Sequence, residues 1–262
     1  MIGQLADTLL ASLSSSEPLQ LLTVAVVVYF VAGVIKGTLG IGFPTAAVSL
    51  LAQVTDARTA ITLVIMPMLI TNLWQVLRAQ KFLSVIKQMW LLISMMLILI
   101  ILFSQLSSQV PVDKLAAVLG CIVALYALHS LFARPLVLNP AFDKSAQVVA
   151  GISAGIMGGL VSVWAPPILI YLHTLRMPKE GFISTVGVLL LLGTCVLLMS
   201  YVGSGVLTYG LFLCSSLLIF PSLLGFTIGE IVRKRISSHR FERLLLWFFF
   251  LMGLNLIRRA LF

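Results

Sequence analysis

Long apolar runs separated by short polar loops fill the whole chain. Eight such blocks can be drawn, at about residues 19–53, 58–77, 88–104, 114–133, 146–175, 180–201, 206–232 and 241–262. An α-helix needs about 20 apolar residues to cross a bilayer, and most of these blocks have at least that length. The pattern therefore predicts an all-α polytopic membrane protein, with residues 1–262 in a single membrane domain.

The first and fifth blocks are the longest, and each contains a glycine-rich interruption that ends in proline. Three glycine pairs lie 118 positions apart, namely Gly33/Gly151, Gly37/Gly155 and Gly40/Gly158. Three later pairs lie 122 positions apart, namely Pro44/Pro166, Thr62/Ser184 and Asn72/Thr194. The chain therefore contains an internal repeat, with repeat one at about 19–133, a linker at about 134–145 and repeat two at about 146–262. Each repeat is one broken block and three ordinary ones.

Composition and charge agree with a membrane protein. Apolar residues make up 60% and charged residues 10% of the chain, against roughly 45–50% and 25% in soluble domains. The 17 Lys and Arg residues outnumber the 8 Asp and Glu residues. Almost all of these basic residues lie in short loops between apolar blocks, where they set membrane topology. The basic excess therefore indicates a lipid bilayer as partner and not a nucleic acid.

The loop charges favour one way of crossing the membrane. Eight single crossings would divide the basic loop residues seven against nine, which gives no orientation. If blocks one and five each return to the face they entered, the division becomes twelve against four. Because Lys and Arg concentrate on the cytoplasmic side, this scheme predicts two inverted repeats in the cytoplasmic (inner) membrane. Each repeat then holds a broken or re-entrant helix pair and three transmembrane helices, with both termini outside. Two parallel repeats of four simple crossings remain the alternative.

Breaks at the same place in two repeats are typical of a transporter's substrate site. Non-helical backbone survives at membrane depth where it is buried in protein or lines a cavity, and a helix that starts there directs free N–H groups at an anion. Pro44 and Pro166 suit the first turn of such a helix. Close helix packing is the alternative for the Gly-x3-Gly patterns. We favour packing at 225–229 and a site at the two repeated motifs.

Lys36 is the sharpest single candidate, because an ionisable residue deep in an apolar block is costly and usually functional. A cation between two broken helices would reinforce anion binding, whereas a snorkelling lysine would only reach an interface. Ala154 stands at the matching position of repeat two by the glycine register. The predicted substrate-binding residues are Lys36, Gly37, Thr38, Gly40, Gly42, Pro44, Thr62, Asn72, Ser153, Gly155, Gly158, Gly159, Trp164, Pro166, Ser184 and Thr194. For the hydroxyl and amide side chains, interhelical hydrogen bonding is the alternative.

Other chemistry finds little support in the sequence. The three cysteines and three histidines are scattered, so we expect neither a metal nor a cofactor. Residues 151–155 spell the G-x-S-x-G pattern of hydrolases, but that motif needs a strand–turn–helix context. A membrane-embedded enzyme or assembly factor is therefore a minor alternative. Aromatic residues near block ends predict an interfacial belt, formed by Trp90, Tyr201, Tyr209 and Trp247.

The duplicated motifs resemble those of the sulfite exporter TauE/SafE family over the full length of the chain. The resemblance rests on Gly33-x3-Gly37-x2-Gly40-x-Gly42-x-Pro44, on Ala57-Arg58-x3-Thr62 with Pro67 and Asn72, and on the second motif ending in Pro166. Two departures are Ile41, where many members resemble a run of glycines, and the spacing from Gly159 to Pro166. The resemblance implies a permease for a small sulfur-containing anion, such as sulfite, thiosulfate or an organosulfonate. A permease for another small ligand, a carboxylate or a cation, is the alternative.

Overall fold

The computed structural model describes residues 18–79, 82–107, 109–132, 138–233 and 238–261, and no β-strand occurs within these ranges. The first half holds α2 (Pro18–Leu39), α3 (Phe43–Leu51), α4 (Ala57–Leu63), α5 (Ile65–Ala79), α6 (Phe82–Gln88), α7 (Trp90–Ser107) and α8 (Val112–Phe132). The second holds a short 3-10 helix (Pro140–Phe142), α9 (Asp143–Val161), α10 (Ala165–Thr174), α11 (Lys179–Gly203), α12 (Tyr209–Leu217), α13 (Ile219–Arg233) and α14 (Ser238–Leu261). Residues 134–137 of the predicted linker lie outside the described ranges.

Eight helical segments in these ranges are long and apolar enough to cross a membrane. Six of them coincide with predicted blocks to within a few residues, and the other two cover only the first parts of blocks one and five. The all-α polytopic prediction is confirmed, and the chain is a multi-pass membrane protein. The half-length helices α3 and α10 are not among the eight. They have 9 and 10 residues, or about 14–15 Å, roughly half the hydrocarbon core of a bilayer.

Blocks one and five are each broken into a long helix and a short one. Repeat positions can now be compared by element ends, because α2 and α9 end at Leu39 and Val161 and α3 and α10 begin at Phe43 and Ala165. Both offsets are 122, as is the offset between the first residues of α4 and α11. This register differs by about one helical turn from the 118-residue offset of the glycines. In the 122-residue register, Gly158 rather than Ala154 corresponds to Lys36.

The first break is formed by two glycines. Gly40 has φ +82° and Gly42 has φ +89°, a left-handed conformation that costs other residues about 1–2 kcal/mol. The Gly40 N–H still bonds the Lys36 carbonyl at 2.6 Å, and Gly42 caps α3. In the second break Ser162 adopts φ +57°. Pro44 and Pro166 lie in the first turn of α3 and α10, as expected.

The other glycines of the two motifs belong to continuous helices and pack against neighbours. A Cβ on Gly37 would lie 2.9 Å from the Gly229 Cα of α13, and a Cβ on Gly229 would lie 2.9 Å from the Gly37 Cα. On the other side, a Cβ on Gly155 would lie 2.8 Å from a carbonyl oxygen of α7, and one on Gly159 would lie 2.8 Å from a backbone nitrogen there. The structure therefore places Gly37, Gly155 and Gly159 in helix contacts and not at the breaks.

A proline divides the second span into α4 and α5. Pro67 has no N–H, so the carbonyl of Leu63 lacks its normal helical donor. The Ser215 hydroxyl of α12 donates to that carbonyl at 2.7 Å and accepts from the Met66 N–H at 3.1 Å. The polar groups freed by the kink are thus satisfied inside the protein, as a membrane interior requires.

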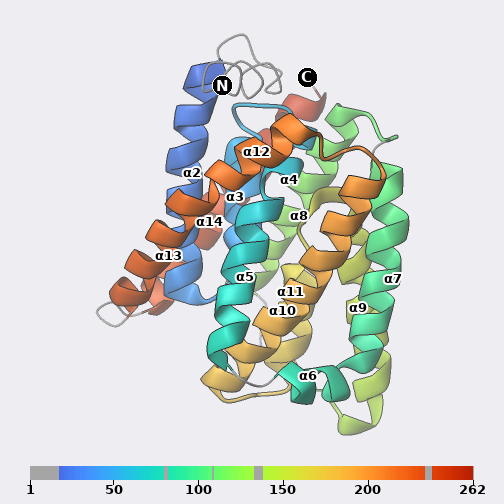
Figure 1. Ribbon diagram of the computed structural model, residues 1–262. Helices are drawn as coiled ribbons and strands as arrows, with labels where there is room; N and C mark the ends of the chain where they lie inside the picture. The colour runs from blue at the N-terminus through green and yellow to red at the C-terminus, as the bar shows by residue number, and fades with distance from the viewer. Residues whose placement is uncertain (1–17, 80–81, 108, 133–137, 234–237, 262) are drawn as a thin grey trace.

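The largest helix contacts join the two halves of the chain. They are α2 with α13, α7 with α9, α8 with α14, and α5 with α11. In the two predicted repeats, α2 corresponds to α9, α7 to α13, α5 to α11 and α8 to α14. The α2–α13 contact therefore has its counterpart in the α9–α7 contact, and each of the other two contacts joins a helix to its own counterpart. Figure 1 shows α4–α5 and α11 running in opposite directions, with Pro18 and Leu261 at the same end of the bundle. An inverted repeat would give this arrangement, and the relation itself stays a prediction.

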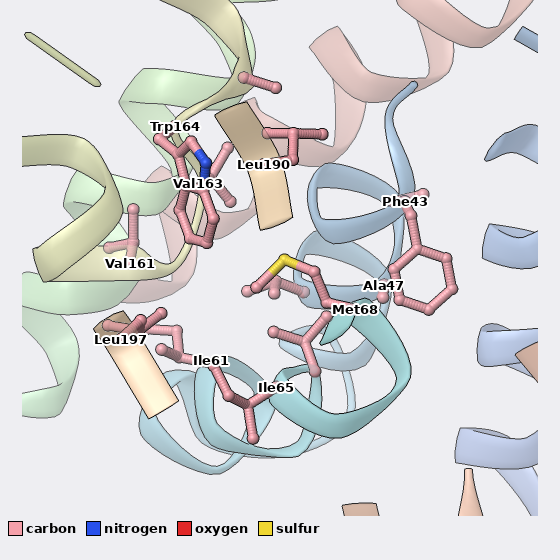
Figure 2. Packing of buried hydrophobic residues seen from close by; sticks show 14 of the residues in the cluster. Phe43, Ala47, Ile61, Ile65, Met68, Val161, Val163, Trp164, Leu190 and Leu197 are labelled. Atoms are coloured by element: carbon pink, nitrogen blue, oxygen red, sulfur yellow. The ribbon is translucent and has the colours of Figure 1, made fainter. Parts of the chain in front are cut away.

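A dense apolar cluster fills the space between the two breaks (Figure 2). Met68 of α5 and Leu190 of α11 lie between Trp164 of the second break and Phe43 of α3, and all four side chains are buried. Met68 and Leu190 are equivalent positions in the 122-residue register. The non-helical backbone at both breaks is therefore enclosed by protein and kept away from lipid.

Candidate functional site

Lys36 lies near the end of α2 with none of its surface exposed. Its ammonium donates to the Thr71 hydroxyl at 3.2 Å and to the Asn72 side-chain oxygen, both on α5. The Phe43 ring centroid lies 6.0 Å from the ammonium nitrogen, at the outer limit of a cation–π contact. The side chain therefore points into the bundle, and the snorkelling alternative is wrong.

The partners of this ammonium are neutral. Within the described residues the one ion pair is between Arg78 and Glu230, at 2.8 Å. No carboxylate of these residues forms an ion pair with Lys36. A buried charge is normally paired, because taking it out of water costs several kcal/mol. Two neutral oxygens and an aromatic face offset only part of that cost. Lys36 therefore provides a strong attraction for an anion.

The hydrogen bonds continue from Lys36 across to the second half of the chain. The Asn72 amide donates to the Thr194 hydroxyl of α11 at 3.1 Å, and that hydroxyl donates to the Leu190 carbonyl at 2.6 Å. Asn72 and Thr194 are equivalent positions of the two predicted repeats, and here they touch each other. These hydrogen bonds join α2, α5 and α11, and we call the four residues Lys36, Thr71, Asn72 and Thr194 the central cluster.

The second break brings together a different set of side chains. The Ser162 hydroxyl lies 3.1 Å from the Tyr201 hydroxyl and 3.4 Å from the Ile61 carbonyl oxygen. Tyr201 is 1% exposed, so its place in an interfacial aromatic belt is wrong, whereas Trp90, Tyr209 and Trp247 are exposed. Trp164 is fully buried, and its indole N–H has no partner.

The remaining predicted site residues do not join the central cluster through a hydrogen bond. Thr38 donates to the Val34 carbonyl at 2.8 Å and lies 3.3 Å from the Gly229 carbonyl of α13, so it supports helix packing. Thr62 donates to a carbonyl of its own helix at 2.8 Å. Ser184 is buried with an unpartnered hydroxyl, and Ser153 is partly exposed on α9.

Thr71 is the cluster residue that sequence reasoning missed. It precedes Asn72, which was predicted, but it has Gly193 and not a polar residue as its equivalent in the second half. The repeat comparison that indicated Asn72 and Thr194 therefore gave no signal for Thr71. An ammonium has three N–H donors, so more than one acceptor near Lys36 could have been expected.

A separate pocket of about 480 Å³ lies around Arg58, Thr59 and Thr62 of the α4–α5 span and the segment 204–206 after α11. It is at the end of the bundle where α4 and α12 begin, which is also the end of Pro18 and Leu261 (Figure 1). Thr62 precedes Asn72 by ten residues, or about 15 Å along a helix. Thr62 in the pocket and Asn72 in the central cluster therefore belong to the same span, but the pocket itself does not include the central cluster.

The hydrolase-like and metal-binding patterns considered from the sequence have no counterpart in the described residues. The G-x-S-x-G segment at 151–155 is an uninterrupted part of α9, so its serine has no strand–turn–helix elbow. Among the described His, Cys, Asp and Glu residues, no three gather in a group that could hold a metal ion.

Comparison with known proteins identifies the family. The family model named sulfite exporter TauE/SafE matches residues 25–256, which include both breaks and the whole central cluster. No curated protein and no solved structure matches the chain. A match over nearly the full length, on an eight-span helical bundle with two broken blocks, shows that the chain belongs to the sulfite exporter TauE/SafE family of membrane transporters.

Proposed function

We propose that this protein is a permease for a small sulfur-containing anion, namely sulfite, thiosulfate or an organosulfonate. The single observation that carries the proposal is the buried Lys36 ammonium, which has only neutral partners. An anion beside it would supply the missing opposite charge. A cationic substrate would meet the same ammonium as a repulsion in a low-dielectric site.

The central cluster has the groups needed to replace an anion's hydration shell. The Lys36 ammonium would provide charge, and the Asn72 amide would provide N–H donors once it turns from its present partners. The Thr71 and Thr194 hydroxyls can also donate. Hydrogen bonds to charged groups are worth about 1.5–3 kcal/mol each. A few such bonds, made together, would compensate for the lost water.

The distribution of basic residues supports an orientation in the cytoplasmic membrane with both termini outside. Figure 1 places the starts of α4 and α8 and the end of α14 at the end of Pro18, and these segments carry Arg58, Lys114, Arg258 and Arg259. The opposite end holds the end of α5, helix α6, the start of α9 and the α10–α11 loop, which carry Arg78, Lys87, Lys144 and Arg176. In this orientation the pocket near Arg58 opens outside.

Alternating access would then depend on the two broken helices. The central cluster lies at the α5–α11 crossing, with one break on each side, so motion of either hairpin would open it toward one face. An inside-negative potential favours anion exit by about 2.3 kcal/mol per charge per 100 mV. Export of the anion therefore needs no other energy source.

Flux measurements in proteoliposomes of defined potential test the proposal. Wild-type protein should carry sulfite or an organosulfonate in a potential-dependent way, while Lys36→Ala and Lys36→Glu should reduce flux at least tenfold. Lys87→Ala, which removes an exposed lysine from α6, is the matched control and should transport normally. Flux of a carboxylate with no flux of any sulfur anion, or normal sulfur-anion flux by well-inserted Lys36→Ala, would overturn the proposal.

A further inference from the structure

The indole N–H of Trp164 is a buried donor without an acceptor among the residues that the structure describes. Trp164 is the N-cap residue of α10, in the second break, with none of its surface exposed. Its ring nitrogen has no hydrogen-bond partner. Buried tryptophan N–H groups normally find an acceptor, because leaving one unpaired costs free energy. An unpartnered donor at a helix break is therefore a candidate for contact with a ligand.

The position of this indole mirrors that of the Lys36 side chain. In the 122-residue register, Gly158 is equivalent to Lys36, and Gly193 is equivalent to Thr71. A Cβ on Gly158 would lie 3.0 Å from the Trp164 ring, and a Cβ on Gly193 would lie 3.0 Å from its ring nitrogen. The indole thus occupies, in the second half, the space that the lysine and threonine side chains occupy in the first.

Both donors face the crossing of α5 and α11. The Lys36 ammonium bonds Thr71 and Asn72 on α5. On the other side, the Trp164 nitrogen lies against Gly193, whose neighbour Thr194 accepts from Asn72. Figure 2 shows the indole nitrogen turned toward the α11 segment that carries Leu190.

We propose that the Trp164 indole N–H is the donor with which the second half of the protein holds the transported anion, at the position equivalent to the Lys36 ammonium. This rests on the proposed function and deepens it. Lys36 is the one fully buried Lys or Arg side chain among the residues whose burial the structure describes, so the crossing holds at most one positive charge beside the neutral N–H.

A site with one positive charge selects for singly charged anions. A dianion would leave a net negative charge in a low-dielectric interior, which is strongly unfavourable. The substrate class is therefore a monoanion that carries a sulfonate-like group, such as hydrogen sulfite or an organosulfonate. This narrows the proposed substrates, because thiosulfate is a dianion at neutral pH. Sulfate and other dianions should compete poorly.

Nitrogen-15 labelling of the tryptophan side chains tests the N–H directly by NMR of the purified full-length protein. The chain has four tryptophans, and the other three are 41–55% exposed. Trp164→Phe identifies the Trp164 signal. Methanesulfonate should move this signal downfield and leave the Trp247 signal in place, and sulfate at the same concentration should produce no shift.

Binding measurements give the second readout. Replacing Trp164 with benzothienylalanine keeps the ring size but removes the N–H, and Trp164→Phe removes it with a smaller ring. Both changes should weaken methanesulfonate binding about tenfold or more, while Trp247→Phe, at an exposed position, should not. The benzothienyl variant decides the result if Trp164→Phe lowers the melting temperature of the unliganded protein.

The outcomes separate this inference from the proposed function. If methanesulfonate binds in a Lys36-dependent way but neither the indole signal nor the benzothienyl variant responds, Trp164 is not a ligand and the permease assignment stands. Sulfate that displaces methanesulfonate at equal concentration would overturn the monoanion selection. If no sulfur anion binds wild-type protein, the proposed function fails together with the role of Trp164.

Discussion

At Lys36, a buried basic side chain is held by oxygens that carry no charge. Thr71 and Asn72 accept two of the three ammonium N–H groups, and the Phe43 ring lies 6.0 Å away. These contacts hold the side chain in one place without neutralising it. The Lys36 ammonium is therefore ready to take an anion without first breaking an ion pair.

Asn72→Asp should weaken anion binding, because it gives Lys36 a counter-charge inside the protein. The substitution places a carboxylate of nearly the same size where the amide oxygen now accepts from Lys36, so the ammonium gains a permanent internal counter-charge. Breaking such a buried pair is costly. We expect anion binding to fall at least tenfold and the melting temperature of the unliganded protein to rise, as measured in detergent.

Asn255→Asp is the matched control for this change. Asn255 lies on α14 and donates to the Gln53 side chain, with no contact to the central cluster. It should leave anion binding unchanged. Wild-type affinity in a well-folded Asn72→Asp variant would show that the anion does not use the Lys36 ammonium.

Sequence could predict part of the site because two of its signals, hydropathy and the internal repeat, can be read from the chain alone. The depth of Lys36 follows from the apolar residues around it, and the 122-residue offset pairs Asn72 with Thr194. The Trp164 ring against Gly158 and Gly193 could not be predicted, because that contact depends on how α10 turns after the break. Thr71 was missed because it has no polar equivalent in the second half, and because the rotation of α5 that brings it to Lys36 together with Asn72 is not visible in the sequence.

At the level of helices, the Gly-x3-Gly patterns are contact surfaces. Sequence reasoning assigned the 225–229 pattern to packing and the pattern at Gly33 and Gly37 to the substrate site. The structure shows that the two patterns meet, with α2 and α13 in backbone contact. A hinge and a close helix contact both need a residue without a side chain. Sequence alone therefore could not separate these roles.

Gly37→Leu and Gly225→Leu should consequently be equally damaging. Each places a large side chain against the backbone of the partner helix, where a Cβ alone would already meet atoms at 3.0 Å or closer. Overpacking of this kind costs about 1–3 kcal/mol or more. Thermal melting in detergent should show similar losses for both variants. A mild Gly225→Leu beside a severe Gly37→Leu would contradict the shared contact and favour a separate role for Gly37.

The first break should depend on its glycine conformations. Gly40→Ala forces a Cβ into φ +82°, which should destabilise the hairpin by about 1–2 kcal/mol. The melting temperature and the anion affinity should both fall. Gly203→Ala, at the end of α11 where a Cβ would meet nothing within 4 Å, should be neutral. Equal melting temperatures for Gly40→Ala and wild type would show that this backbone is not strained.

Over the whole molecule, the charge distribution predicts a topology that reporter fusions can measure. A reporter after Phe262 should lie outside the cytoplasm, and one in the Arg233–Arg243 loop should lie inside. Charge asymmetry orients a chain because basic loops are retained on the cytoplasmic side. Only α14 separates the two insertion points, so each fusion serves as the control for the expression and insertion of the other. A cytoplasmic C-terminus would contradict the inverted scheme.

The pairing of helices across the two halves has a consequence for biosynthesis. Since α2, α5, α7 and α8 find their main partners in α13, α11, α9 and α14, the first four spans leave the ribosome before any of those partners exists. They must wait in the lipid as separate helices, with Lys36 stabilised only by its neighbours on α5. Assembly is therefore expected to begin when α9 inserts beside α7 and to finish with α13 and α14. A ribosome that stalls after Phe132 would leave a chain without its major contacts, which is a natural substrate for membrane quality control.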